Sequence, residues 1–210
     1  MSDTLAPSTP ADADGDGGGR SGRSRIAPFV ALGIAAVFAL LFFVFARSDS
    51  GEAESADTRW LNQPAPDTTG RLAGTGGNTG VPERTWSLAQ RSGSWVVLNF
   101  FDSTCGPCVA EHPELVDFDA GQDTRGADQI ELVSVLWGND PARSFEYLQE
   151  NGLDWDVVYD DGSIANVYGV TKVPETWIVD PNGYVRRRYI GEVSAQLLID
   201  TVATFEAPVQ

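Results

Sequence analysis

The run Trp95–Phe101 is almost continuously apolar, and the sequence Cys105-Gly106-Pro107-Cys108 follows it after three residues. A run of this length and composition is typical of a strand that is buried on both faces of a sheet. The residues from about Gly106 to Ala120 predict a helix, because proline is favoured in a first helical turn, and Pro113 predicts a kink in it. A buried strand that leads to a cysteine pair at a helix start predicts an α/β fold.

The rest of the chain beyond Gln63 also alternates between apolar runs and helix start signals. Asp140 and Ser194 stand where helix N-caps are expected, and Pro141 follows the first of them. The order of the elements predicts a mixed sheet that helices cover on both faces. The predicted elements are a glycine-rich loop between short strands at 70–80, strands at 129–137 and 155–159, helices at 141–150 and 163–168, a hairpin of 176–180 with 184–190, and a helix from 194 to about 205.

The two cysteines of the chain, Cys105 and Cys108, stand at the predicted start of the helix. Unsatisfied backbone N–H groups and the positive end of the helix stabilise a negative charge there, so this position favours a thiolate at Cys105. Cys108 lies about one turn deeper in the helix. We therefore predict that Cys105 attacks the disulfide of a partner and that Cys108 resolves the resulting mixed disulfide.

Two other uses of the cysteine pair are left open by the sequence. An inert disulfide that closes so small a loop would stabilise the fold by only about 2 kcal/mol. A zinc site could combine Cys105, Cys108 and His112, but a closed site needs a fourth ligand. Only a carboxylate could supply that ligand, because the chain holds no other Cys or His. The redox interpretation is therefore preferred, and neither a metal nor a cofactor is predicted.

The stretch Ile26–Ala46 holds 21 residues without a charge. As a helix it would span the roughly 30 Å of a bilayer core, and it is longer than the apolar core of a cleaved signal peptide, which is the alternative interpretation. Arginines precede it and acidic residues follow it, so the N-terminus is expected in the cytoplasm. We expect a disordered tail at 1–25, a single-pass anchor in the cell membrane at 26–46, an acidic linker at 47–62 and an extracytoplasmic domain at 63–210.

The chain carries 30 acidic and 14 basic residues, which gives it a formal net charge of −16. Such a surface repels phosphate backbones, so a nucleic-acid partner is not expected. Apolar residues make up 42% of the chain, as in globular proteins. The outer segment, with roughly 145 residues, is long enough to bury a sizeable core.

Several segments of the outer domain occur in an order that a known family shares. They are Pro64-Ala-Pro-Asp67, Val97-Leu-Asn-Phe-Phe101, Cys105-Gly-Pro-Cys108, Ala110-Glu111-His112, Gly169-Val170, Val173-Pro174-Glu175-Thr176, Asp180 and Gly183. In these segments, residues 63–206 resemble the membrane-anchored thioredoxin-like family of the TlpA, ResA and DsbE type. The resemblance implies a thioredoxin-like fold with an N-terminal hairpin and a central insertion at about residues 141–168.

The same resemblance implies thiol-disulfide exchange outside the cytoplasm, with reduction of protein disulfides in cytochrome c maturation. Its expected partners are protein disulfide or thiol substrates, including apocytochrome c, and a membrane thiol-transfer protein that donates electrons. Two departures leave the substrate open, because Thr104 stands where the family usually has tryptophan and Gly106-Pro107 is the dipeptide of general thioredoxins. The alternatives are a general oxidant or reductant of exported proteins, and a tethered binding module whose cysteine pair is structural or binds a metal.

Roles for residues outside the cysteine pair also follow from the resemblance. Glu111 is expected near the cysteines, where it could move a proton or shift the pKa of a thiol, or else to be a solvated surface glutamate. Pro174 is expected to be cis and to face the cysteines, which leaves the Val173 backbone free to pair with an extended substrate. The remaining residues expected to contact the substrate are Gly106, Pro107 and Glu175, the last of which could instead be a loop charge.

Asn99 and His112 are two further polar residues near the predicted site. Asn99 occupies the place where ordinary thioredoxins bury an aspartate, so no acid–base role is expected at that position. Histidine titrates in a suitable pH range, but no partner for His112 is evident in the sequence. We therefore expect His112 to lie on the helix surface or beside the site rather than to act as a base.

Overall fold

The structure is a computed structural model that describes residues 33–34, 36–40, 53–77, 79–122 and 129–207. The chain divides into two compact units, residues 1–49 and residues 50–210. In the first unit, residues 33–34 and 36–40 are helical. Within the described ranges, no helix has both the length and the apolar character needed to cross a membrane. The expected tail at 1–25 and most of the expected anchor at 26–46 lie outside the described residues, so both stay predictions.

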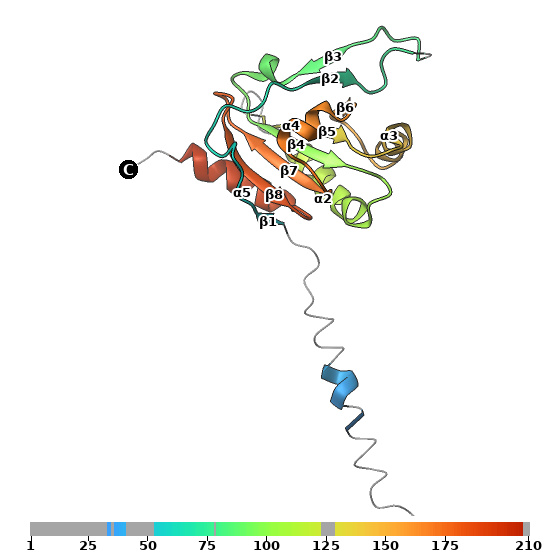
Figure 1. Cartoon of the computed structure of the whole chain (residues 1–210), viewed down its shortest axis with the longest axis vertical. Coiled ribbons are helices and arrows are strands. Elements are labelled where there is room, and N and C mark those ends of the chain that lie inside the picture. Colours follow the sequence, from blue (N-terminus) through green and yellow to red (C-terminus); the bar gives the residue numbers. More distant parts are fainter. Residues whose placement is uncertain (1–32, 35, 41–52, 78, 123–128, 208–210) are drawn as a thin grey trace, which may run out of the picture. The chain divides into compact units, whose positions relative to one another are not determined.

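One eight-stranded sheet, in the order β1-β8-β7-β4-β5-β6-β2-β3, forms the frame of the second unit (Figure 1). β4 (Val96–Phe101) is buried along its whole length and pairs parallel with β5 (Glu131–Leu136) and antiparallel with β7 (Glu175–Val179). The predicted mixed sheet and the buried strand before the cysteines are therefore confirmed. The other strands are β1 (Glu54–Ser55), β2 (Thr69–Leu72), β3 (Thr85–Ser87), β6 (Asp156–Tyr159) and β8 (Val185–Ile190).

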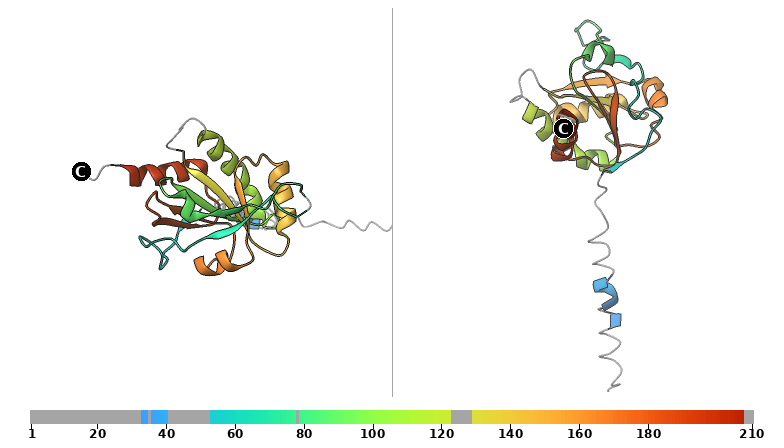
Figure 2. Two further views of the ribbon diagram at one scale, coloured as in Figure 1. Left: turned by 90° about the horizontal axis from the view of Figure 1, so that it is seen from above. Right: turned by 90° about the vertical axis from the view of Figure 1, so that its left-hand side faces the viewer.

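Helices cover both faces of this sheet (Figures 1 and 2). Alternate side chains of β4 point to opposite faces. Val97 lies in the core with residues of α2 and α5, whereas Leu98 packs in the core that includes α4. Phe101 shares a cluster with residues of α2 and α3, so α3 covers the same face as α2. The helices are α2 (Gly106–Gln122), α3 (Pro141–Glu150), α4 (Ser163–Tyr168) and α5 (Ala195–Glu206), and a short 3₁₀ helix, η1, spans Leu88–Arg91.

Side-chain caps fix the starts of two helices where the sequence predicts them. The Asp140 side chain accepts a hydrogen bond from the Arg143 N–H at 3.1 Å. The Ser194 side chain accepts one from the Leu197 N–H at 3.2 Å. Each bond satisfies a backbone donor that has no partner within its own helix, so these residue types mark the boundary reliably. Pro113 lies inside α2, which continues through it to Gln122.

Two chain segments extend the sheet beyond β5. The central residues 141–168 form α3, β6 and α4, and β6 pairs parallel with β5. The expected N-terminal hairpin consists of β2 and β3, and β2 also pairs antiparallel with β6. Gly70 lies in β2 rather than in the loop expected at 70–80. A Cβ atom at Gly70 would overlap the Val158 side chain, so the close approach of β2 and β6 requires glycine there.

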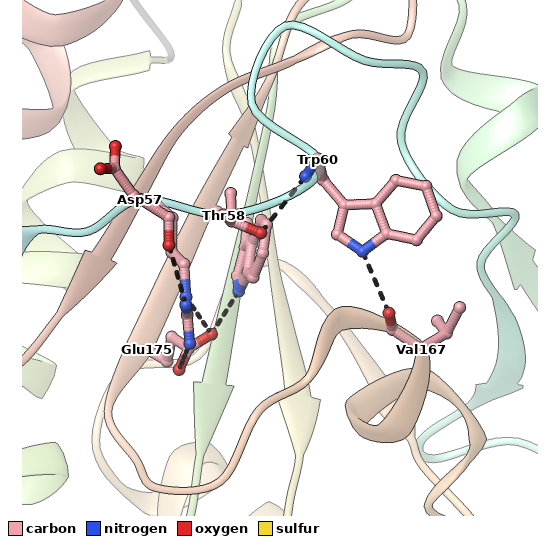
Figure 3. Close-up of polar contacts among 7 residues, drawn as sticks. Asp57, Thr58, Trp60, Val167 and Glu175 are labelled. Atoms are coloured by element: carbon pink, nitrogen blue, oxygen red, sulfur yellow. Dashed lines mark hydrogen bonds and ion pairs between the residues drawn. The ribbon is translucent and has the colours of Figure 1, made fainter.

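The folded unit begins before Gln63, because part of the segment expected as an acidic linker at 47–62 packs against it. β1 pairs antiparallel with β8 at one edge of the sheet. The Trp60 indole N–H donates to the Val167 carbonyl at 3.1 Å, and the Trp60 side chain packs against the core (Figure 3). Residues 53–62 therefore belong to the domain. A two-residue strand is too short to leave a recognisable pattern in the sequence.

Candidate functional site

The two cysteines follow directly from the end of β4. The Asp102 carboxylate accepts hydrogen bonds from the Thr104 N–H at 2.8 Å and from the Thr104 hydroxyl at 2.9 Å. The Asp102 carbonyl accepts one from the Cys105 N–H at 3.1 Å. α2 begins at Gly106, and the Cys105 carbonyl accepts the Val109 N–H at 3.1 Å. The structure thus has the predicted order of buried strand, turn, cysteine pair and helix.

Cys105 and Cys108 form a disulfide, with their Cα atoms 5.3 Å apart. Cys105 is half-buried, whereas Cys108 is fully buried. The Cys108 N–H donates to Cys105 Sγ at 3.1 Å. Because a helix-start N–H stabilises a negative sulfur, the same contact favours the Cys105 thiolate in the reduced protein. The accessible sulfur is therefore also the one that the helix start can activate.

A cis peptide bond between Val173 and Pro174 lies beside the cysteine pair, as the resemblance implies. The Val173 carbonyl oxygen is 3.4 Å from Cys105 Sγ. Pro174 is buried, Val173 is half-buried, and Gly106 and Pro107 are exposed. A polypeptide that reaches the Cys105 sulfur therefore also comes within reach of the Val173 backbone.

Glu111 lies on the α2 turn after Cys108 and is only 1% exposed. The Asn99 side-chain amide donates to Glu111 Oε1 at 2.6 Å, and the Val193 N–H donates to Oε2 at 2.7 Å. Burial raises the pKa of Glu111 from 4.5 to about 8; the two hydrogen bonds oppose this rise and the Glu192 charge adds to it. The alternative of a solvated surface glutamate is therefore wrong, and Glu111 can change its protonation state near neutral pH.

A cavity of about 620 Å³ between α2 and the start of α5 reaches Glu111. Three further carboxylates line this cavity, those of Glu114, Glu192 and Asp200. Glu114 and Asp200 are exposed, so the cavity is open to solvent on that side. The cavity therefore gives protons a route between the solvent and the buried Glu111 carboxyl.

Glu175 lies inside the fold rather than in the substrate groove expected for it. It is fully buried in β7, and both of its carboxylate oxygens accept hydrogen bonds from the Arg188 guanidinium at 3.0 Å. Glu175 Oε1 also accepts from the Trp177 indole N–H at 2.7 Å, and Arg188 donates to the Asp57 carbonyl at 3.4 Å (Figure 3). The expectation of a groove residue or loop charge is thus corrected, because Arg188 and Trp177 hold this carboxylate inside the fold.

His112 is buried as well, instead of lying on the helix surface. Its Nε2 atom donates to the Asn151 carbonyl at 2.9 Å. The rings of Phe101, Tyr147 and Trp155 pack around it, with ring centroids 5.5 to 6.0 Å from that of the imidazole. Burial lowers the pKa of His112, although the hydrogen bond to Asn151 opposes this effect. Among the residues that the structure describes, no group of three or more His, Cys, Asp or Glu side chains could hold a metal ion.

Sequence reasoning does not find the partners of the two buried glutamates. Arg188 is one of three successive arginines in β8, and only the register with β7 decides which of them lies beside Glu175. Val193 acts through its backbone N–H, which leaves no sequence signal. The position of Asn99 could have been predicted. It lies two residues from Val97 in a buried strand, so both side chains point to the face of the sheet that α2 covers.

The sequence profile of the AhpC/TSA family matches residues 61–188, which is more than half of the chain. The chain belongs to the AhpC/TSA family. Curated relatives of the chain include proteins of the ResA and DsbE type. The resemblance to proteins of the ResA and DsbE type is thereby confirmed, and the membrane anchor stays a prediction.

Three relatives illustrate this similarity. The chain is 28% identical to the thiol-disulfide oxidoreductase ResA of Oceanobacillus iheyensis over 119 residues, which are 56% of this chain and 60% of the relative. It is 31% identical to the thiol:disulfide interchange protein HelX of Rhodobacter capsulatus over 110 residues, 51% of this chain and 58% of the relative. It is 26% identical to the thiol:disulfide interchange protein DsbE of Xylella fastidiosa over 170 residues, 80% of this chain and 79% of the relative. The matches to ResA and HelX thus span less than two thirds of those relatives.

Solved structures of the same type share the architecture. A secreted thiol-disulfide isomerase from Corynebacterium glutamicum superposes with a TM-score of 0.58 at 18% identity, covering 74% of this chain and 90% of that one. A DsbF homologue from Corynebacterium diphtheriae gives a TM-score of 0.55 at 19% identity, covering 75% of this chain and 94% of that one. Similarity at these identities establishes the thioredoxin-like α/β fold, in agreement with the sequence prediction.

Proposed function

We propose that this protein is a membrane-tethered, extracytoplasmic thiol-disulfide oxidoreductase that reduces protein disulfides. The observation that carries the proposal is the half-buried Cys105 sulfur at the start of α2. This sulfur accepts the Cys108 N–H and lies 3.4 Å from the Val173 carbonyl, next to the cis Pro174. The relatives named thiol-disulfide oxidoreductase or thiol:disulfide interchange protein support the same chemistry.

The exchange consists of two sulfur transfers. In the reduced protein, the Cys105 thiolate attacks one sulfur of a substrate disulfide; a mixed disulfide forms and the other substrate sulfur leaves as a thiolate. Cys108 then loses its proton and attacks Cys105 Sγ, which forms the Cys105–Cys108 disulfide and releases the second substrate sulfur as a thiolate. Two electrons have passed from the cysteine pair to the substrate. A membrane thiol-transfer protein returns them by reducing the pair.

Glu111, in its ionised form, accepts the proton that Cys108 loses in the second transfer. Residues three apart on a helix are neighbours, so Glu111 stands beside Cys108. With a pKa of about 8, the Glu111 carboxyl can both bind and release a proton near neutral pH, as a proton acceptor in this step must. The cavity between α2 and α5 then lets the proton pass to solvent.

The substrate is an extended segment of an exported protein, and apocytochrome c is the substrate that the motif resemblance implies. The Val173 backbone is accessible beside Cys105, and an extended chain can pair with it as with the edge of a sheet. The proposed location outside the cytoplasm is supported by the 21 uncharged residues at Ile26–Ala46 and by the arginines before them.

Reduction of insulin by dithiothreitol, catalysed by the full chain in detergent, tests the proposed activity. We expect catalysis by the wild type and none above background by Cys105→Ser. Equal rates for the two proteins would refute the redox role and favour the binding module.

The midpoint potential of the cysteine pair decides the direction of exchange. A value near about −270 mV supports a reductant, and one near about −120 mV supports a general oxidant of exported proteins.

A further inference from the structure

Asn99 lies in the middle of β4, fully buried between α2 and β7. Its side-chain amide donates to Glu111 Oε1 at 2.6 Å and to Thr176 Oγ1 at 3.1 Å. Its own oxygen, Oδ1, has no hydrogen-bond partner within the described part of the chain. A buried acceptor without a partner costs free energy, so such an atom calls for an explanation.

The hydrogen bonds around Glu111 suit its ionised form better than its protonated form. Both carboxylate oxygens accept, Oε1 from Asn99 and Oε2 from Val193, which suits the ionised form. A proton on Oε1 that points toward Asn99 would place an O–H donor against the N–H donor of the amide. Turning the Asn99 amide by about 180° would remove this conflict, because Oδ1 would then accept from the Glu111 O–H.

The second amide orientation uses the same neighbours as the first. Thr176 Oγ1 accepts from the Asn99 amide in one orientation, and its hydroxyl can donate to Oδ1 in the other. The Val193 N–H keeps its acceptor, because Oε2 stays unprotonated. Oδ1 lacks a partner in the first orientation, and the amide nitrogen lacks one in the second. The unpaired atom therefore favours neither orientation. The protonation state of Glu111 therefore decides which orientation is held.

We propose that Asn99 is a positioning residue for Glu111, whose side-chain amide turns over when Glu111 binds a proton and turns back when the proton leaves. The inference rests on the proposed function, because it explains how Glu111 can accept and release a proton during thiol exchange. Glu111 can then hold or release a proton without leaving its own oxygen unpaired inside the fold. An aspartate at position 99 would instead set a second carboxylate against Glu111 and make the two compete for one proton.

Several charged or titratable groups face Glu111 from the elements packed around it. Glu114 of α2, Glu192 of the loop after β8, and Asp200 of α5 line the cavity that reaches it, and Cys108 precedes it on α2. β4 and β7 contribute Asn99 and Thr176, which carry no charge. The Glu111 pKa of about 8 lies within the range in which a thiol titrates, so both amide orientations are populated under the conditions of exchange.

Nuclear magnetic resonance of the full chain in detergent tests the coupling directly. The disulfide is kept intact, so that no thiol titrates. The Asn side-chain amides and Glu side-chain carboxyls are followed from about pH 5 to about pH 10. We expect the Asn99 amide signals to change with the same midpoint as the Glu111 carboxyl. This change should be lost in Glu111→Gln and retained in Glu114→Gln, the matched loss of a carboxylate in the same cavity. Asn99 signals that stay constant through the Glu111 titration would overturn the proposal.

A variant of Asn99 gives a second, functional test. Asn99→Leu removes both the donor and the acceptor, so the Glu111 midpoint should rise by about one pH unit or more. The pH profile of insulin reduction should move in the alkaline direction by a similar amount. An unchanged Glu111 midpoint in Asn99→Leu would refute the positioning role, and if this variant does not fold, the wild-type titration decides. A wild-type protein that shows the coupled Asn99–Glu111 titration but does not catalyse insulin reduction would instead refute the proposed function and leave the positioning role standing.

Discussion

Glu111 should make the stability of the protein fall as the pH rises through the neutral range. Its pKa is about 8 in the folded protein and 4.5 in the unfolded chain, so the folded state keeps a proton that the unfolded state has released. The stabilisation is complete below pH 4.5 and is lost progressively up to about pH 8. Each pH unit of that interval is worth about 1.4 kcal/mol, which gives about 5 kcal/mol in all.

Guanidinium unfolding of the oxidised full chain, followed by tryptophan fluorescence, measures this effect. Glu111→Gln cannot titrate, so the free energy of unfolding of the wild type should fall relative to the variant by about 2 to 3 kcal/mol between pH 6 and pH 8. Glu114→Gln, which also removes a carboxylate from the cavity, should run parallel to the wild type. Parallel curves for the wild type and Glu111→Gln would show that the folded protein does not hold this proton and would refute the reasoning.

Three further expectations concern the fold and the topology. Arg188→Met should lower the free energy of unfolding by about 3 to 5 kcal/mol, because it leaves the buried Glu175 carboxylate without its counter-charge. A loss below about 1 kcal/mol in a denaturant titration would contradict this expectation. Gly70→Ala should cost about 1 to 3 kcal/mol, since the new Cβ overlaps Val158, and an unchanged midpoint of unfolding would contradict it. A reporter that works only after export, fused after Gln210, should be active; activity of a cytoplasmic reporter there would reverse the proposed orientation.

The sequence predicts those parts of the site that depend on local structure. The apolar run before Cys105 predicts the strand, and the proline at the helix start predicts where α2 begins, so the positions of both sulfurs follow. The caps at Asp140 and Ser194 predict two further helix starts for the same reason, because each signal lies within one turn of the feature that it fixes.

The environment of the two glutamates could not be predicted, because groups distant in the chain create it. Glu111 is buried by α5 and the loop before it, and its second hydrogen bond comes from a backbone N–H 82 residues away. Glu175 is neutralised by Arg188, which only the register of β8 against β7 brings to it. β1 escapes prediction because a strand of two residues at a sheet edge has no pattern of its own.

Trapping of mixed disulfides tests the central claim, that Cys105 is the nucleophile and Cys108 the resolving thiol. The full chain carrying Cys108→Ser or Cys105→Ser is incubated with an exported protein fraction, thiols are blocked, and non-reducing gels are compared with reducing ones. Because Cys105 is accessible and receives a helix-start N–H while Cys108 is fully buried, only Cys108→Ser should accumulate adducts that reduction releases. Equal trapping by the two variants, or trapping by Cys105→Ser alone, would contradict the account.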